Sequence, residues 1–337
     1  MPYPSEYAAE GALFMGAYGS FQEWGGFCRF AISHTPKRIT GAPMRINCFD
    51  AWKTLMAELA DRMISPLFVR GDVKPSQTTY AFLLPENYLK EGSPRLDPPP
   101  FLARLGLLGK FGSLILPENG TANLPADLKA GATLGTNLPK AAVPTVPADG
   151  TAKTFFTEML RKKLIPAANL DLEKELYTSD TGELSLNHKK KSLCVVTPRT
   201  EGFFLQRNQS RNGAFASVKN NAGHAVFFFT ARDNQPLSTS RRILFMHLTD
   251  CKNNGARFSS DDFTICENKG QTPILVRRGD ATVTLHIPGD VRIYACRMDG
   301  KHIREVPFTR SGEKISFQAK TFVGKEPVLV YEITKGN

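Results

Sequence analysis

The chain has 337 residues, of which 41% are hydrophobic and 10% aromatic, and this ordinary globular composition excludes an intrinsically disordered protein. No apolar run reaches the roughly 18 residues of a membrane-spanning helix, and the first residues lack the basic and apolar regions of a signal peptide. The formal net charge of +11 permits an anionic ligand, but the basic residues form short scattered clusters without a recognisable nucleic-acid motif.

The six cysteines lie far apart, without a Cys-x-x-Cys pair or a histidine at zinc spacing. We therefore expect no metal site. We expect no other cofactor either, because Walker-type loops and Gly-x-Gly-x-x-Gly sequences are missing from the chain. Cys28, Cys194 and Cys296 stand in apolar, strand-like contexts, and the sequence favours free buried thiols over disulfides there.

The N-terminal part, residues 1–84, has the pattern of a piece of an α/β domain. A helix is predicted from Ser5 to Phe21, a strand from Phe27 to Ile32, and a second helix from Asp50, as its N-cap, to Met63. The strand is apolar on both faces except at Arg29, which is typical of a strand buried between helices. A lone buried strand leaves backbone groups unpaired, so we expect a missing segment, or self-association through its open edges, to cover it.

Two further strands are predicted at Leu67–Val73 and Thr78–Leu84, and then the composition changes. Residues 85–177 are rich in Ala, Pro, Gly and Thr over much of their length. We interpret them as an irregular excursion or linker with short helices near residues 101–108 and 154–163, serving as a binding loop or as a passive connection.

The C-terminal part, residues 178–337, is almost wholly β in pattern. Strands of alternating polarity are separated by turn signals such as Asn253-Asn254-Gly255 and Asp299-Gly300. In the strand near residue 285 we expect Val283, Leu285 and Ile287 to point inward together. The predicted fold class is α+β, with a partial α/β barrel-like N-terminal segment followed by an antiparallel β-sandwich.

Three stretches carry a resemblance to a known family. They are Ala17–Ala31, Leu67–Pro75, and Ser179–Asn187 together with Val195–Gly202. Together they resemble the C-terminal part of large bacterial glycoside hydrolases of the clan A type, which carry a (β/α)8 barrel followed by a β-sandwich. Members of that family are often secreted or periplasmic. The resemblance implies that the helix from Ser5 is the seventh barrel helix and that Phe27–Ser33 is the eighth barrel strand.

The same resemblance implies that the catalytic carboxylates are absent from this chain. Retaining glycosidases use two carboxylates about 5 Å apart, one as acid/base and one as nucleophile. In clan A both stand on barrel strands that would lie before Met1. We therefore expect a glycoside-hydrolase-like fragment that is inactive alone. Glu6 and Glu10 have the spacing of a solvated helix face, and Glu23 would face the wrong end of the barrel, so none of the three is predicted to be catalytic.

Three residues are candidates for contact with carbohydrate. Ser33 and His34 follow the predicted strand at the end where barrel active sites are built, although a lone histidine there is more often a packed residue than a ligand. Trp24, beside a pair of glycines, either stacks on a sugar or belongs to the core. A rival hypothesis is a non-catalytic β-sandwich protein that binds an anionic glycan or a protein surface through its basic clusters.

Overall fold

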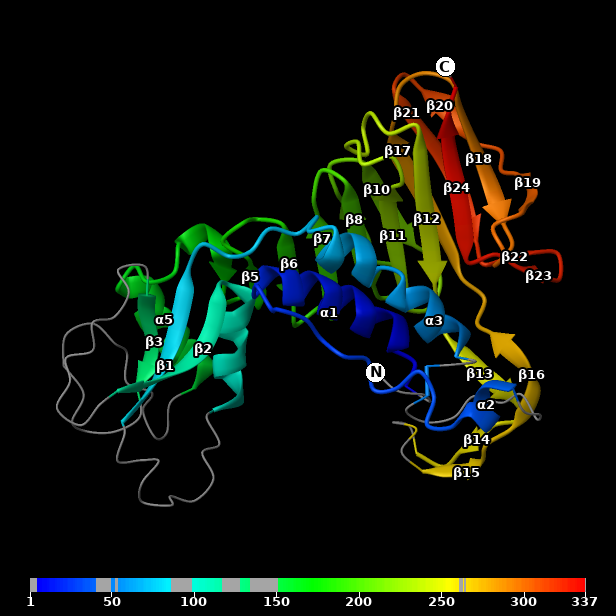
Figure 1. Cartoon of the computed structure of the whole chain (residues 1–337). Coiled ribbons are helices and arrows are strands. Elements are labelled where there is room, and N and C mark those ends of the chain that lie inside the picture. Colours follow the sequence, from blue (N-terminus) through cyan, green and yellow to red (C-terminus); the bar gives the residue numbers. More distant parts are fainter. Residues whose placement is uncertain are drawn as a thin grey trace. The chain divides into compact units, whose positions relative to one another are not determined.

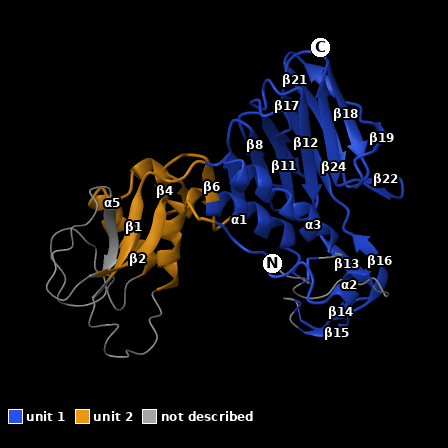
Figure 2. Ribbon diagram, viewed as in Figure 1, with its two compact units in different colours: residues 1–19, 26–73, 191–337 blue, residues 20–25, 74–190 orange. Residues whose placement is uncertain are grey.

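The structure is a computed structural model, and it describes residues 5–40, 50–51, 54–85, 99–116, 128–133, 151–260, 263 and 265–336. The chain divides into two compact units (Figure 2). Unit 1 consists of residues 1–19, 26–73 and 191–337, and unit 2 of residues 20–25 and 74–190. This division joins segments that are distant in the sequence. It does not test the predicted division into residues 1–84, 85–177 and 178–337, which stays a prediction.

Unit 1 is built around two antiparallel sheets (Figure 1). The first contains β9 (Ser210–Asn212), β10 (Ala216–Asn220), β17 (Asp280–His286), β20 (Thr309–Ser311) and β21 (Lys314–Lys320), in the order β20-β21-β17-β10-β9. The second contains β7 (Ser192–Val196), β8 (Thr200–Leu205), β11 (Ala225–Ala231), β12 (Arg242–Leu248), β18 (Val291–Cys296), β19 (His302–Glu305) and β24 (Val330–Lys335). Within unit 1 their order is β19-β18-β24-β12-β11-β8-β7.

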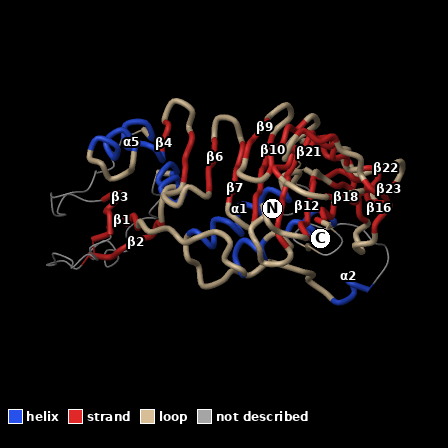
Figure 3. Tube along the Cα trace, turned by 90° about the horizontal axis from the view of Figure 1, so that it is seen from above, coloured by secondary structure: helices blue, strands red, loops and turns tan. Residues whose placement is uncertain are grey.

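The two sheets enclose the main hydrophobic core, as a β-sandwich does. Figure 3 shows β9, β10 and β21 in one layer and β12 and β18 in the other. The predicted register of β17 is confirmed, because Val283, Leu285 and Ile287 are all fully buried in this core. The antiparallel, sandwich-like C-terminal part of the fold prediction is therefore correct, and strand β17 alternates between buried and more exposed residues as the sequence indicated.

Strand β11 departs from alternation because it is buried along its whole length. Phe227 and Phe229 face the core between the sheets. On the opposite face, a Cβ at Gly202 of β8 would lie 2.5 Å from Leu13 and 3.4 Å from Phe228 of β11, so the helix that carries Leu13 covers this face. A strand that is covered on both sides needs apolar side chains at every position.

Four helical segments precede the sandwich in unit 1: α1 (Ala8–Phe21), α2 (Pro36–Thr40), α3 (Leu55–Asp61) and the π-helical turn η1 (Ser65–Val69). The first predicted helix is confirmed as α1. The second is shorter than predicted, and Thr54, not Asp50, stands at the N-cap position of α3, while residues 52 and 53 lie outside the described residues. The strand predicted at Leu67–Val73 is wrong, because η1 occupies its first half.

The strand predicted at Phe27–Ile32 is also wrong. These residues form an irregular segment in which Phe30 is 73% exposed and Ile32 is 65% exposed. An apolar run forms a buried strand only when neighbouring strands pair with its backbone groups, and no described strand lies beside this one. The structure consequently shows no barrel-like arrangement of residues 1–84, and it gives no support to self-association through strand edges at this segment.

Unit 2 contains a small parallel sheet. Its strands β1 (Thr79–Pro85), β2 (Lys110–Leu116) and β3 (Leu128–Thr133) lie in the order β2-β1-β3. The first strand was predicted, and the other two were not. The other elements of unit 2 are η2 (Pro100–Leu107), α5 (Ala152–Arg161), η3 (Ala167–Asn169), β4 (Leu170–Asp171), β5 (Leu176–Thr178) and β6 (Leu184–Asn187).

Unit 2 has a core of its own, in which side chains of β1, η2 and α5 pack together. The short helices predicted near residues 101–108 and 154–163 correspond to η2 and α5. In unit 1, β13 (Cys251–Asn254) pairs with β16 (Gln271–Val276), β14 (Arg257–Phe258) with β15 (Cys266–Asn268), and β22 (Phe322–Val323) with β23 (Glu326–Pro327). Among the described residues, no helix has the length and apolar character needed to cross a bilayer.

Candidate functional site

The residues predicted to contact carbohydrate lie in different units. Trp24 belongs to unit 2 and is 39% exposed. Ser33 and His34 belong to unit 1, where the Ser33 hydroxyl donates to the carbonyl of Thr35 at 3.0 Å. Each is described within its own unit, and their role in carbohydrate binding remains a prediction.

His34 forms a pair with Asp50 that the sequence analysis missed. The His34 Nδ1 and backbone nitrogen lie 2.5 and 3.1 Å from Oδ1 of Asp50, whose side chain is buried. Asp50 therefore orients the imidazole and does not cap α3. A nucleophilic triad needs a hydroxyl bonded to such an imidazole, whereas the Ser33 hydroxyl is bonded to Thr35. The pair holds the segment 33–35 in place.

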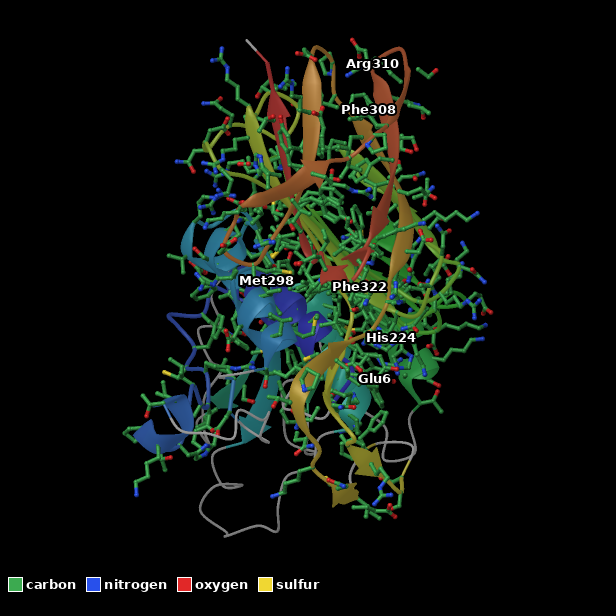
Figure 4. All side chains as sticks on the ribbon, turned by 90° about the vertical axis from the view of Figure 1, so that its right-hand side faces the viewer. Glu6, His224, Met298, Phe308, Arg310 and Phe322 are labelled. Carbon is green, nitrogen blue, oxygen red and sulfur yellow. The ribbon has the colours of Figure 1, made fainter. Side chains whose placement is uncertain are left out.

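The three carboxylates weighed in the sequence have separate surroundings. Glu6 precedes α1, and its carbonyl lies 3.0 Å from Nε2 of His224 (Figure 4). Burial raises the pKa of Glu10 to about 7, which is the range of a general acid. Glu23, in unit 2, forms an exposed ion pair with Lys110 at 2.9 Å.

A buried ionic network joins the end of η1 to the second sheet. The carboxylate of Asp72 is fully buried and accepts from Arg70 Nε at 2.9 Å, from Arg199 Nη2 at 2.7 Å and from the Thr200 hydroxyl at 2.6 Å. Arg70 also donates to the Ala231 carbonyl at 2.7 Å. Both carboxylate oxygens of Asp72 accept from groups inside the fold, so we interpret the network as structural.

A second buried carboxylate ties the two sheets together. Glu201 of β8 accepts from the backbone nitrogens of Phe215 at 2.7 Å and Ala216 at 2.9 Å, at the start of β10. Burial raises the pKa of Glu201, and these hydrogen bonds oppose the rise. A Cβ at Gly213 would lie 2.2 Å from Oε2 of Glu201, so glycine is required where the chain passes this carboxylate.

We expect Gly213→Ala to lower the free energy of unfolding by about 1–3 kcal/mol, the usual range for overpacking a filled interior. The added methyl must displace a carboxylate that two backbone nitrogens hold in place. Chemical denaturation of the variant measures the loss. Gly289→Ala is unsuitable as a control because its φ is positive, whereas Gly112→Ala adds a methyl that meets no atom within 4 Å. Equal stability of Gly213→Ala and Gly112→Ala would contradict the explanation.

A cleft of about 210 Å³ opens between the two sheets of unit 1. It lies beside the part of β21 that β20 does not cover, since β20 pairs only with residues 314–316. Its floor is apolar and buried, and consists of Ala295 of β18, Val306 and Tyr331 of β24. The Tyr331 hydroxyl donates to the backbone carbonyl of Lys320, which fixes the ring at the base of the cleft.

The rim of the cleft is polar and basic. It consists of Arg304 of β19 on one sheet and Gln318 and Lys320 of β21 on the other, and all three are exposed. Neither Arg304 nor Lys320 forms an ion pair within the described part of the chain, although nearby Glu326 and Glu332 do pair with basic residues. Burial raises the pKa of Tyr331 and the charge of Arg304 opposes the rise, so the guanidinium acts on the base of the cleft.

Two aromatic residues next to the cleft in the chain are covered by guanidinium groups. The Arg310 Cζ lies 5.8 Å from the ring centroid of Phe308, and the Arg278 Cζ lies 4.7 Å from that of Phe322. Arg310 also donates to backbone carbonyls, including that of Gly289 at 2.8 Å, so its charge is committed to the fold. Arg304 and Lys320 therefore remain the cations available at the cleft.

The cysteines of the described residues are free, and Cys194, Cys251 and Cys296 are buried. The buried thiol predicted at Cys28 is wrong, because Cys28 is exposed in the irregular segment that replaces the predicted strand, and Cys266 is exposed as well. No group of three or more metal-ligating side chains occurs among the residues that the structure describes. Comparison of the chain with protein-family models, with curated proteins and with solved structures finds no match.

Proposed function

We propose that the chain serves as the sandwich-bearing, non-catalytic part of a glycoside hydrolase of the clan A type, and that it acts on or contacts carbohydrate in that setting. The proposal is supported by a resemblance to that family, which lies in Ala17–Ala31, Leu67–Pro75, Ser179–Asn187 and Val195–Gly202. The antiparallel, sandwich-like unit 1 is the kind of fold that the resemblance implies for the C-terminal part. No cofactor takes part in hydrolysis of a glycosidic bond by this route.

The observation that carries the proposal is an exposed apolar surface on the N-terminal segment of unit 1. Phe30, Ile32, Ile39 and Val69 are all large and exposed, and Val69 reaches 77%. Single exposed apolar residues are ordinary, but several along one segment mark a surface that another polypeptide covers. In the proposal, the other parts of a barrel cover this apolar surface.

The chemistry of the proposal separates the catalytic carboxylates from this chain. Displacement at an anomeric carbon needs an acid on the leaving oxygen and a second carboxylate, and retaining enzymes place the two groups about 5–5.5 Å apart. The proposal assigns both groups to barrel strands that this chain does not supply. Unit 1 then supports the barrel through α1 and α3, which pack on the second sheet.

We expect the purified chain to show no turnover of aryl glycosides or oligosaccharides above the buffer rate, because removing a catalytic carboxylate costs several kcal/mol of transition-state stabilisation. A longer chain that extends in frame upstream of Met1 should be active on at least one of the same substrates. The measurement follows release of the aryl group by the purified chain, called the short chain below, and by the extended chain.

Glu10→Gln provides the matched control for this experiment. Burial gives Glu10 a pKa of about 7, so it is the carboxyl of the N-terminal segment best suited to donate a proton. Turnover by the short chain that disappears in Glu10→Gln would refute the proposal and place an active site on α1. Inactivity of both the short and the extended chains would refute it as well.

The cleft with its basic rim favours a second candidate function, namely a non-catalytic β-sandwich protein that binds an anionic glycan. The dependence on salt distinguishes the two. Binding governed by exposed charges weakens steeply as the Debye length falls from about 10 Å at 0.1 M salt to about 3 Å at 1 M. Binding of a neutral sugar by a hydrolase surface should change little over the same range.

A further inference from the structure

We propose that the cleft between β21 and β19 binds a sugar residue that carries a carboxylate, as part of an acidic oligosaccharide. The inference does not depend on the hydrolase proposal. It rests on the second candidate function and gives that function a site and a class of ligand.

The charges of the rim point to an anion. Arg304 and Lys320 reach the cleft from opposite sheets, and neither has an ion-pair partner within the described residues. A planar guanidinium matches a carboxylate in a bidentate, fork-to-fork arrangement, and an ammonium adds a point charge. A carboxylate placed between the two sheets would be held by both groups.

The floor points to a ring and not to a free ion. Ala295, Val306 and Tyr331 give the cleft an apolar base, and Val323 and Pro307 complete its wall. A phosphate or sulfate site is instead commonly built from converging backbone N–H groups at a helix terminus, and no described helix ends at this cleft. An apolar floor under a charged rim suits a pyranose, which has an apolar face and polar edges.

Gln318 adds a group suited to a sugar hydroxyl. Its Nε2 donates to the Thr282 hydroxyl at 3.0 Å, which orients the amide and leaves Oε1 as an acceptor. The volume of about 210 Å³ is below the roughly 300–1,000 Å³ of sites that enclose drug-sized ligands. The cleft therefore accommodates one sugar residue, and its open side lets the chain of the glycan continue along the rim.

One carboxylate lies close to the site. Asp280 is the register partner of Lys320 on β17, and its charge raises the pKa of Tyr331. Its negative charge disfavours a second anion at this end of the cleft, so the proposal places the carboxylate of the ligand at Arg304.

The experiment titrates the full chain with a disaccharide that contains glucuronic acid, and in parallel with the same disaccharide after reduction of the carboxyl to a hydroxymethyl group. Binding is followed through the amide chemical shifts of β21 and β19. We expect the acidic disaccharide to bind and the reduced one to bind at least about tenfold more weakly, as for loss of a charge-assisted hydrogen bond. Arg304→Gln and Lys320→Gln should each weaken binding about fivefold.

Lys314→Gln is the matched control, because Lys314 is exposed on the same strand but does not line the cleft. It should bind like the unchanged chain. Equal affinity for the reduced disaccharide, or inorganic phosphate that competes as well as the acidic disaccharide does, would overturn the carboxylated-sugar assignment. Binding that survives in Arg304→Gln and Lys320→Gln would place the ligand elsewhere and leave only the second candidate function standing. Absence of binding at about 10 mM disaccharide would refute both.

Discussion

Replacing Asp72 by asparagine should lower the free energy of unfolding by about 3–5 kcal/mol, the cost of removing one partner from a buried ion pair. The Asp72 carboxylate is fully buried and neutralises two guanidinium groups, with Arg70 at 2.9 Å and Arg199 at 2.7 Å. Without its charge, both cations remain partly buried and unpaired. Denaturation by guanidinium chloride, followed by circular dichroism of the sheets, measures the loss.

Asp299→Asn is the control for this experiment. Asp299 also faces a basic residue, Lys301, at 3.8 Å, but both side chains are more than half exposed. Exposed pairs contribute roughly 0–1 kcal/mol, so this variant should unfold almost like the unchanged chain. The explanation fails if both variants lose the same stability, or if Asp72→Asn loses less than about 1 kcal/mol.

The sandwich could be predicted because the features that specify each strand lie within that strand and its adjoining turns. Strands such as β17 alternate between buried and exposed residues, and turn residues mark their ends, so both the strands and the inward side of β17 follow from the sequence. Strand β11 does not alternate, and its seven uncharged residues are all buried. The sequence could not show that Leu13 covers the second face of this sheet, because the contact joins residues 13 and 202, which are far apart in the chain.

The prediction failed where a strand depends on distant partners. Phe27–Ile32 and Lys110–Leu116 are both short apolar runs, and only the second finds a neighbouring strand in this chain, β1. A short apolar run does not by itself reveal whether pairing will occur. A strand was also wrongly predicted at Leu67–Val73. There the apolar run forms the turn η1 and is followed by the buried pair of Arg70 and Asp72.

The candidate site was out of reach of the sequence for the same reason. Arg304, Gln318 and Lys320 come from two strands of different sheets, and their separation along the chain gives no sign that they share one cleft. The basic clusters that the sequence singled out, such as Arg161-Lys162-Lys163, are partly committed to local ion pairs with Glu158. The basic residues that line the cleft stand singly in the sequence, and only the fold shows that they lie at one cleft.

Stability should also fall in acid because of one buried histidine. His247 of β12 is fully buried, and neither of its ring nitrogens makes a hydrogen bond of good geometry in the described structure. Burial lowers the pKa of His247 from 6.5 to about 3; the backbone carbonyl of Ala319 opposes this shift, and the charge of Arg277 reinforces it. The unfolded chain therefore binds a proton below pH 6.5 that the folded chain does not bind until about pH 3.

This difference in proton binding sets the sign and the size of the effect. Above pH 6.5, His247 does not lower the free energy of unfolding. Below that value the free energy of unfolding decreases as the pH falls, by about 1.4 kcal/mol for each pH unit below the unfolded pKa. At about pH 4.5 the contribution of His247 amounts to roughly 2–3 kcal/mol of lost stability. His247→Leu removes the titrating group and fills a similar volume, so this part of the acid sensitivity should disappear.

The measurement compares free energies of unfolding of the chain and of His247→Leu at several pH values between about 7 and 4.5. Other groups titrate in both proteins and cancel in the difference, which isolates His247. His286→Gln serves as control, because His286 is exposed on β17 and its replacement should leave the pH dependence unchanged. Parallel curves for the chain and His247→Leu would show that His247 is protonated in the folded state near pH 6. The backbone carbonyl of Ala319, which opposes the effect of burial, would then be the acceptor that stabilises the imidazolium.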